Sequence, residues 1–477
     1  MTDKYEPVVG LEVHVELNTK TKIFCSCSTE FGAPVNKNVC PVCMGLPGTL
    51  PVLNKKAVEY AIKAGLATDC SIAESTRLDR KNYFYPDLPK AYQISQYDTP
   101  LCYWGKISIP TANGKKDIRI SRIHIEEDAG KLLHDAEHGT MIDYNRCGVP
   151  LIEIVSEPDI RSADEAREYL TRLRTVILYT GISDCRMNEG SFRCDVNLSV
   201  RKKGDTTFGV RTEMKNINSF SFVAKAIEYE FQRQVEVIES GGQITPETRR
   251  FDSATGKTYT MRSKESAADY RFFPEPDILP FKIDRETVKK LEKEIPMLPD
   301  ERKKLYAQKY GLSFSDADVI TSSPMLADYF ENAAKSTQFP KLAANILLSE
   351  LLAITDQESF DCPIPFTALS ELATLSGERT INSTTVKKLI KLLLLPENAC
   401  SSVRALIDKH DLSQIKDRAM LRGILNSVIE DNPKLISDYK NGKLAAKKAI
   451  IGKVMSQTNG RADPITLNFI FEEVTIC

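Results

Sequence analysis

Apolar and polar residues alternate strictly over residues 10–17, which is the period of a half-buried β-strand. Successive side chains of a strand point to opposite faces of its sheet. The polar face of this strand therefore carries Glu12, His14 and Glu16 together. We expect two carboxylates and an imidazole to share one surface.

Three further segments place polar residues on one face of a predicted strand. They are residues 118–131, where the strand ends in three consecutive acids, residues 191–201 and residues 211–215. If the alternation continues, their polar faces carry Arg122, His124, Glu126 and Asp128 in the first, Arg193, Asp195 and Asn197 in the second, and Arg211, Glu213 and Lys215 in the third. One antiparallel sheet could bring these faces together with that of the first strand.

Two or three strong helices are predicted before residue 295, and the pattern locates two of them. Ser162 and Glu165 form a capping box ahead of an apolar stripe at helical spacing, and Gly181 is the expected end of that helix. The second helix is expected from about Ser221 to Ser240, where a pair of glycines follows.

Helical periodicity dominates from Met297 onward. Segments with this spacing are residues 299–310, 341–355, 385–395 and 439–455. The leucine-rich residues 387–395 are too few to span a bilayer and are expected to form a core helix. The last helix is predicted to be amphipathic, with a basic side opposite the apolar residues Leu444, Ile451, Val454 and Met455.

These patterns predict an α+β fold. Residues 1–295 are expected to form an antiparallel sheet with helices packed on it, residues 296–405 a helical domain, and residues 406–477 a basic helical tail domain. A chain of 477 residues, at roughly 150 residues per domain, also suggests three domains.

Charge and composition narrow the class of protein. The 64 basic and 65 acidic residues nearly cancel, so attraction to nucleic acid must come from a local patch. The N-terminus has no apolar signal core, and no run approaches the ~18 apolar residues of a membrane helix, so we expect a cytoplasmic protein. In that reducing compartment most of the twelve cysteines are expected to be free thiols.

The clearest metal motif is a cluster of cysteines over residues 25–43. Cys25 and Cys27 form one close pair, and Cys40 and Cys43 form the next. Four thiolates at this spacing are typical of a tetrahedral zinc site, which would be structural because no coordination position stays open. The alternative is four reduced thiols in a loop.

A second metal site is predicted from the acids. Carboxylates at high density repel one another, and Mg²⁺ relieves the repulsion by accepting one or two of them beside water and phosphate oxygens. We expect Glu12, His14, Glu127 and Glu153 to hold Mg²⁺, with Glu126 as a further catalytic residue. An isolated Glu-Glu-Asp would more often be a solvated turn.

Cations and an amide of the kind that bind phosphate accompany these acids. Arg193, Asn197 and Lys215 lie on predicted polar faces, and Lys81 flanks an aromatic cluster. Such residues can bind phosphate oxygens and neutralise charge during phosphoryl transfer. The alternative is cross-strand ion pairing on a solvated sheet. No GxxxxGK[ST] loop, GxGxxG fingerprint or GxSxG elbow is present, so phosphate would be held through metal.

The tail carries a basic patch. Lys443, Lys447, Lys448 and Lys453 belong to a run of cations with few acids, and such a patch can engage several phosphates of a nucleic acid. The alternative is a solvated helix face.

Five separated motifs resemble the B subunit family of the bacterial aspartyl/glutamyl-tRNA amidotransferases. They are Val9-Gly-Leu-Glu-Val-His-Val-Glu-Leu17, Leu78-Asp-Arg-Lys-Asn-Tyr-Phe-Tyr-Pro-Asp-Leu-Pro-Lys90, Ile123-His-Ile-Glu-Glu-Asp-Ala-Gly-Lys131, Ile142-Asp-Tyr-Asn-Arg-Cys-Gly-Val-Pro-Leu-Ile-Glu-Ile154 and Asp269-Tyr-Arg-Phe-Phe-Pro-Glu-Pro-Asp277. Residues 443–464 also resemble the tail domain of the family, so the likeness spans essentially the whole chain.

The resemblance implies a catalytic cradle domain like that of glutamine synthetase-type folds. It also implies a three-subunit enzyme that converts Glu-tRNA(Gln) or Asp-tRNA(Asn) into the amidated product. This subunit would use ATP and Mg²⁺ to phosphorylate the side-chain carboxylate of the tRNA-bound amino acid. Ammonia would come from an amidase subunit, with a small third subunit that braces the pair, because this chain has no recognisable amidase nucleophile set.

Two other classes of function stay open from the residues alone. One is a non-catalytic adaptor, in which the zinc knuckle and the basic tail bind tRNA and the acids form salt bridges. The other is a self-contained ATP-dependent ligase for a small carboxylate, which would leave the basic tail unexplained.

Overall fold

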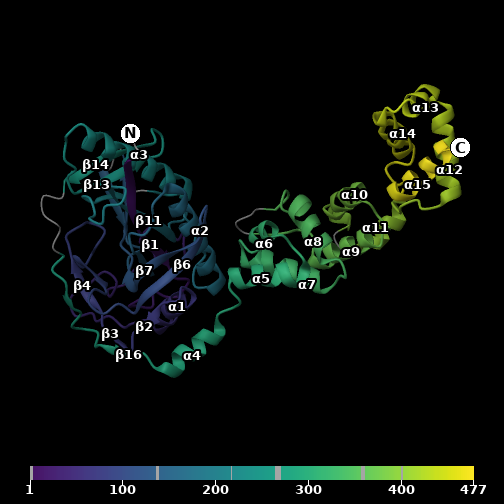
Figure 1. Ribbon diagram of the computed structural model, residues 1–477. Helices are drawn as coiled ribbons and strands as arrows, with labels where there is room; N and C mark the ends of the chain where they lie inside the picture. Colours follow the sequence, from purple (N-terminus) through teal and green to yellow (C-terminus); the bar gives the residue numbers. More distant parts are fainter. Residues whose placement is uncertain are drawn as a thin grey trace. The chain divides into compact units, whose positions relative to one another are not determined.

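The computed structural model describes residues 4–135, 139–215, 217–263, 270–355, 360–398 and 401–476 (Figure 1). Asp269 of the resemblance motif lies outside these residues. The chain forms two compact units, Met1–Leu298 and Pro299–Cys477. In the described ranges, no helix has the length and apolar character needed to cross a membrane. The three-domain division stays a prediction.

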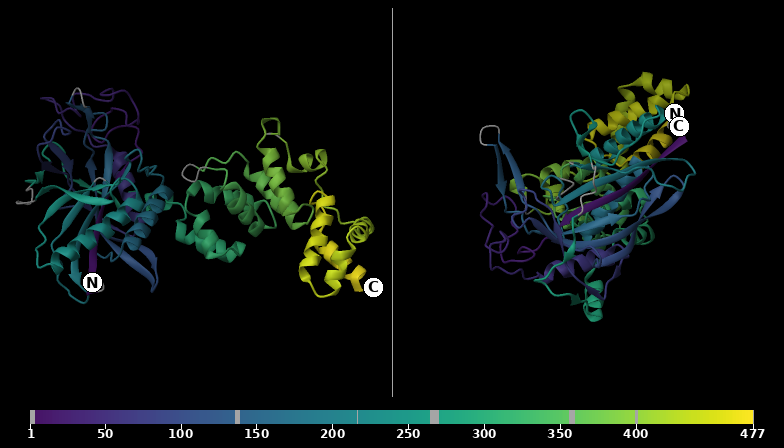
Figure 2. Two further views of the ribbon diagram at one scale, coloured as in Figure 1. Left: turned by 90° about the horizontal axis from the view of Figure 1, so that it is seen from above. Right: turned by 90° about the vertical axis from the view of Figure 1, so that its left-hand side faces the viewer.

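The first unit is built on a nine-stranded sheet with the order β14-β13-β12-β11-β1-β10-β7-β6-β2. Its strands are β1 (Tyr5–Glu16), β2 (Ser71–Ile72), β6 (Cys102–Thr111), β7 (Gly114–Glu127), β10 (Pro150–Ser156), β11 (Phe192–Lys202), β12 (Thr212–Lys215), β13 (Glu247–Asp252) and β14 (Lys257–Ser263). β1, the purple strand that starts at the N label, runs through the middle of the sheet (Figure 2).

The prediction of a purely antiparallel sheet is wrong at one place. β12 and β13 pair in parallel, whereas the other neighbouring strands are antiparallel. The chain between them forms α3 (Phe220–Glu239), a helix long enough to return the backbone to the end at which β12 began.

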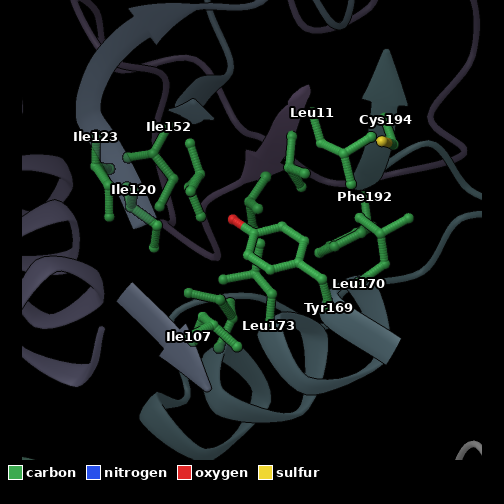
Figure 3. Packing of buried hydrophobic residues seen from close by; sticks show 14 of the residues in the cluster. Leu11, Ile107, Ile120, Ile123, Ile152, Tyr169, Leu170, Leu173, Phe192 and Cys194 are labelled. Carbon is green, nitrogen blue, oxygen red and sulfur yellow. The ribbon is translucent and has the colours of Figure 1, made fainter. Parts of the chain in front are cut away.

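Helices α1 (Lys55–Ala67), α2 (Ala163–Thr180) and α3 bury their apolar sides in the same core as the sheet. The Ser162 hydroxyl accepts a hydrogen bond from the backbone N–H of Glu165, and Gly181 ends α2 with φ +69°, as predicted. Figure 3 shows Tyr169 of α2 among apolar side chains of the strands. One face of the sheet is therefore the core, and the residues that alternate with it form the opposite, polar face.

A β-bulge in β7 changes which residues face the core. Ile118 and Ile120 are buried before it, and Ile123 and Ile125 are buried after it. The pairing with β10 shifts at this point, because Val155 faces Arg122 and the next residue, Ser156, faces Ile120. The extra residue reverses the alternation. It thereby puts Arg122, His124 and Glu126 on the polar face.

Smaller sheets lie in the same unit. They are formed by β15 (Phe273–Pro274), β4 (Asp79–Asn82) and β5 (Tyr92–Ser95), by β16 (Phe281–Lys282) and β3 (Ser75–Thr76), and by β8 (Lys131–Asp135) and β9 (Gly139–Asp143). Helix α4 (Arg285–Glu294) ends the unit. β5 joins β7 through Gln93, whose side-chain N–H donates to the carbonyl oxygen of Glu127.

The second unit is helical. Its elements are α5 (Pro299–Tyr310), α6 (Phe314–Ile320), α7 (Pro324–Lys335), α8 (Pro340–Ile346), η2 (Leu347–Leu351), α9 (Phe366–Gly377), α10 (Ser383–Leu393), η3 (Pro396–Asn398), α11 (Val403–Lys409), α12 (Arg418–Glu430), α13 (Pro433–Lys440), α14 (Leu444–Gln457) and α15 (Pro464–Ile476). It contains two hydrophobic clusters, one between Tyr306 and Ile407 and one between Leu421 and Phe471.

The prediction of one continuous helix over residues 439–455 is wrong. α13 ends at Lys440, Gly442 has φ +88°, and α14 begins at Leu444. The left-handed backbone at Gly442 cannot continue a helix. Leu444, expected on the apolar side, is 73% exposed. The buried residues of α14 are Ala446, Ile450 and Val454.

Candidate active site and cysteine cluster

The polar side chains of the middle strands form rows across the sheet. Neighbouring strands lie about 4.8 Å apart, so residues in register touch. One row runs across β11, β1, β10 and β7 as Arg193, His14, Glu153 and His124, and the next as Asp195, Glu12, Val155 and Arg122. The predicted gathering of acids and imidazole on one face is present in this geometry.

The first group of acids and imidazoles surrounds Glu153. Its Oε2 atom lies 3.5 Å from Nε2 of His14 and 3.4 Å from Nε2 of His124. Glu126 lies 3.6 Å from His14 and 3.7 Å from His124. Ser95 donates a hydrogen bond of 3.1 Å to Glu126. His14, Glu126 and Glu153 are close enough to share one metal ion.

Burial and charge act against each other in this group. Burial disfavours every charged form, but the charge of His124 and its hydrogen bond hold the pKa of Glu153 well below the usual carboxyl range. Burial also opposes protonation of His124, yet Glu153 and Glu126 raise its pKa to about 9. The two carboxylates and the imidazoles therefore neutralise one another's charge in a largely buried site.

A second group lies one row along the sheet. Glu12, Asp195 and Glu213 place carboxylate oxygens within 4.8 Å of one another. Asn197 donates a hydrogen bond of 2.8 Å to Glu12, and Lys215 lies 2.9 Å from Glu213 and also pairs with Asp195. Burial and the charge of Glu153 raise the pKa of Glu12.

Both groups fit hard divalent cations. Carboxylate oxygens are the protein ligands that Mg²⁺ prefers, and it keeps further positions for water and phosphate oxygens. The first group offers two carboxylates and an imidazole, and the second offers three carboxylates. The donor sets therefore suit a metal that also binds phosphate.

The structure does not bring the predicted Mg²⁺ ligands Glu12, His14, Glu127 and Glu153 into one group. Glu12 belongs to the second group. Glu127 follows Glu126 directly and so points to the other face of β7. There its carboxylate pairs with Lys90 and accepts a hydrogen bond of 2.9 Å from the backbone N–H of Ile94.

The predicted phosphate-binding cations lie at the polar face, but two of them are neutralised. Arg193 donates to Asp128 at 2.6 Å, and Lys215 is paired as described above. Lys81 projects from β4, and the charges of Glu126 and Glu153 raise its pKa although burial opposes this. Its Nζ atom lies 5.1 Å from the ring centre of Tyr270.

The site residues named from the sequence omitted His124, Asp195 and Glu213. The signal that could have found them was present, because strand alternation had already placed all three on polar faces. What alternation lacks is the register between strands, which decides which polar residues touch.

The cysteine cluster has the geometry of a metal site. The Sγ atoms of Cys25, Cys27, Cys40 and Cys43 lie within 4.8 Å of one another. Lys22 is fully buried, and its Nζ atom lies 3.7 Å from Sγ of Cys43. A hydrogen bond from Cys25, together with the charge of Lys22, lowers the pKa of Cys43 to about 4 although burial opposes it. Four soft donors with one already ionised suit zinc.

Two of the cavities in the described part of the first unit lie beside the sheet. One of about 210 Å³ is lined by residues of the cysteine cluster and by Lys90 and Glu127. The other, of about 610 Å³, is lined by Glu16, Arg193, Asp195 and residues 29–33. Burial and the nearby Asp128 raise the pKa of Glu16 to about 9. Glu16 is thus a carboxyl group that is protonated at neutral pH and lines this cavity.

The basic residues of the tail differ in their surroundings. Lys443 pairs with Asp438 at 2.9 Å, and Lys447 pairs with Glu472 at 3.1 Å. Lys448 and Lys453 are exposed on α14, and no ion pair holds either of them within the described ranges. These two lysines are the ones best placed to meet an external anion.

Comparison with known proteins gives the family. The GatB/GatE catalytic domain matches residues 7–289, and the GatB domain matches residues 328–474. The B subunit of the aspartyl/glutamyl-tRNA(Asn/Gln) amidotransferase of Caldicellulosiruptor saccharolyticus is 52% identical over 477 residues, 98% of this chain and 99% of the relative. This chain belongs to that family of B subunits.

Other relatives carry the same name. The B subunit of Caldanaerobacter subterraneus subsp. tengcongensis is 50% identical, over 98% of this chain and 99% of its own length. That of Thermodesulfovibrio yellowstonii is 47% identical, over 98% of both chains. The resemblance seen in the motifs is confirmed over nearly the full chain.

Proposed function

We propose that this protein activates the side-chain carboxylate of Glu-tRNA(Gln), Asp-tRNA(Asn) or both by ATP-dependent phosphorylation, so that ammonia can then form the amide. The observation that carries the proposal is the pair of acidic groups in adjoining rows of one sheet face, with Lys81, Arg193 and Lys215 around them. The family name of the relatives supports the substrate class.

The chemistry explains why ATP is needed. A carboxylate is a poor acyl donor because its leaving group would be oxide. In the proposed step a carboxylate oxygen bonds to the γ-phosphorus of ATP, the bond to the β,γ-bridging oxygen breaks, and ADP leaves. Ammonia then attacks the carbonyl carbon of the acyl phosphate, inorganic phosphate departs with the C–O electron pair, and the nitrogen loses a proton.

The residues have separate roles in this proposal. His14, Glu126 and Glu153 would hold one Mg²⁺, and Glu12, Asp195 and Glu213 a second. When bound, Mg²⁺ supplies positive charge to phosphate oxygens. Asn197 orients Glu12 through its hydrogen bond. Lys81 lies near the acids and would bind phosphate oxygens through its ammonium group. Arg193 and Lys215 keep the nearby acids ionised and positioned.

The remaining parts of the chain complete the proposal. The cluster of Cys25, Cys27, Cys40 and Cys43 holds a structural zinc ion, and Lys443, Lys447, Lys448 and Lys453 contribute to tRNA binding by the tail. The amidase subunit and a small third subunit of a cytoplasmic heterotrimer are the partners, and ammonia comes from the amidase. The likeness of the first unit to glutamine synthetase-type folds belongs to the same proposal.

The test measures ADP release by this protein co-expressed with its amidase and small partners. Mg²⁺, ATP and either Glu-tRNA(Gln) or Asp-tRNA(Asn) are supplied, with uncharged tRNA as the control. We expect ADP release that requires the charged tRNA and falls by at least about 100-fold in Glu153→Gln. Binding of charged tRNA without ADP release would contradict the proposal and favour the adaptor. ADP release with free glutamate or aspartate would favour the small-carboxylate ligase.

A further inference from the structure

Arg122 is a cation of the polar face that the roles above leave unused. Its Nε atom is buried and has no hydrogen-bond partner, and no acid pairs with its guanidinium, as far as the described residues go. A buried N–H donor without a partner is unfavourable, because it has lost its hydrogen bond to water and gained none from the protein. An arginine in this state beside a substrate site is expected to gain its partner from the substrate.

A β-bulge in β7 places Arg122 on the polar face of the sheet. Ile118 and Ile120 face the core, so regular alternation would also turn residue 122 inward. The bulge at Ser121 reverses the alternation and puts Arg122 beside Val155 on the polar face. Bulges are found next to active sites because they redirect single side chains in this way.

Two other arginines of the same face are neutralised. Arg193 donates to Asp128, and Arg119 makes a bidentate pair with Asp159 at 2.7 and 2.9 Å. Arg119 lies on the same strand as Arg122 and differs from it in having that partner. The difference marks Arg122 as the arginine of β7 that is free to bind an anion.

The row that contains Arg122 indicates which anion it meets. Val155 lies between Arg122 and Glu12, so the two charged residues stand two strand spacings apart, about 10 Å. Glu153, of the first acidic group, neighbours Val155 on the same strand face. A phosphoryl group above Val155 would therefore have Glu12 of the second acidic group on the β1 side and the guanidinium of Arg122 on the β7 side, with the first acidic group next along the sheet.

We propose that Arg122 binds oxygens of the phosphoryl group that passes from ATP to the carboxylate. This inference rests on the proposed function. A guanidinium offers two parallel N–H donors to phosphate, and it stabilises charge that spreads over the phosphoryl oxygens during transfer. Arg122 is thus a further catalytic residue of the polar face.

The experiment compares Arg122→Ala, Arg122→Lys and the matched control Arg119→Ala in the complex with the partner subunits. ADP release with charged tRNA, binding of a non-hydrolysable ATP analogue with Mg²⁺, binding of charged tRNA and thermal unfolding are measured for each. We expect Arg122→Ala to lower ADP release about 100-fold or more, with tRNA binding within about twofold of wild type. Added guanidinium at millimolar concentration should restore part of the activity of Arg122→Ala.

The lysine variant should retain less than about a tenth of wild-type activity, because lysine keeps the charge but loses the planar pair of donors. Arg119→Ala should release ADP as wild type does. Wild-type ADP release by Arg122→Ala would overturn the inference. A loss of tRNA binding with normal analogue binding would overturn it too, in favour of a tRNA phosphate. Absence of ADP release by the wild type itself would instead contradict the proposed function.

Discussion

Glu126 and Glu127 are adjacent in the chain but act on opposite faces of β7. Glu126 lies 3.6 Å from His14 within the first acidic group, whereas Glu127 pairs with Lys90 beside the cysteine cluster. A strand turns successive side chains through half a circle, so the two carboxylates cannot serve one metal ion. Their substitutions should therefore have different consequences.

Glu126→Gln should lower ADP release with charged tRNA by on the order of 100-fold, because the amide cannot supply an anionic ligand. Glu127→Gln should instead lower the free energy of unfolding by about 1–3 kcal/mol, because Lys90 loses its charged partner. Urea unfolding and ADP release of both variants check this. If both variants lost ADP release equally and kept wild-type stability, the two residues would not have the separate roles described here.

The cysteine cluster should bind zinc. We expect about one equivalent of zinc per chain, and Cys43→Ser should lose it and unfold roughly 5–10 °C lower. Cys362, an unclustered cysteine of the second unit, gives the control Cys362→Ser, which should keep the metal. Elemental analysis and thermal unfolding of the three proteins test this prediction. An unchanged zinc content in Cys43→Ser would show that the cysteine cluster does not bind the metal.

Glu16 should make stability depend on pH. Its pKa in the folded protein is about 9, above the ordinary carboxyl value of the unfolded chain, because burial and Asp128 disfavour its charge. The folded protein is stabilised because it holds the proton of Glu16 more tightly than the unfolded chain does. This stabilisation is fully present below about pH 4.5 and is lost as pH rises toward 9. Glu16→Gln should raise the urea midpoint relative to wild type at pH 8.5 but not at pH 4.5. A gain of equal size at both pH values would be inconsistent with this titration.

A buried ion network holds α3 against β13. Arg249 lies 3.2 Å from Glu230 and 2.6 Å from Glu247. Arg249→Met would leave both acids without this cation and should cost about 3–5 kcal/mol of unfolding free energy. The neighbouring Arg250 is exposed, so Arg250→Met should change stability by less than about 0.5 kcal/mol. Denaturant titration of the two variants compares the costs, and similar values would show that the network adds little.

The tail lysines should contribute unequally to tRNA binding. Replacing the exposed Lys448 and Lys453 with glutamine should weaken binding and lower the salt slope of log K by about one for each lysine. Replacing Lys443 and Lys447, which already pair with acids, should have a smaller effect. Filter binding over a range of salt concentrations measures both pairs of substitutions. A larger effect on tRNA binding from replacing Lys443 and Lys447 would show that tRNA does not bind α14 through Lys448 and Lys453.

Local pattern was enough for much of the fold. The strand over residues 192–202, the capping of α2 by Ser162 and the end of α2 at Gly181 follow from alternation and capping, which depend on neighbouring residues. The same rules failed at residues 439–455, because the left-handed backbone of Gly442 separates two helices that share one periodic pattern.

The sequence alone predicted which side chains of a strand lie on its polar face, because successive side chains of a strand alternate between the two faces. It also predicted the cysteine cluster, because the spacing of the thiols is visible along the chain. The grouping of Glu153 with His14 and His124, the bulge between Ile120 and Arg122 and the pairing of Glu127 with Lys90 came with the tertiary structure. These depend on strand register and on a bulge, which are selected by packing between residues far apart in the chain.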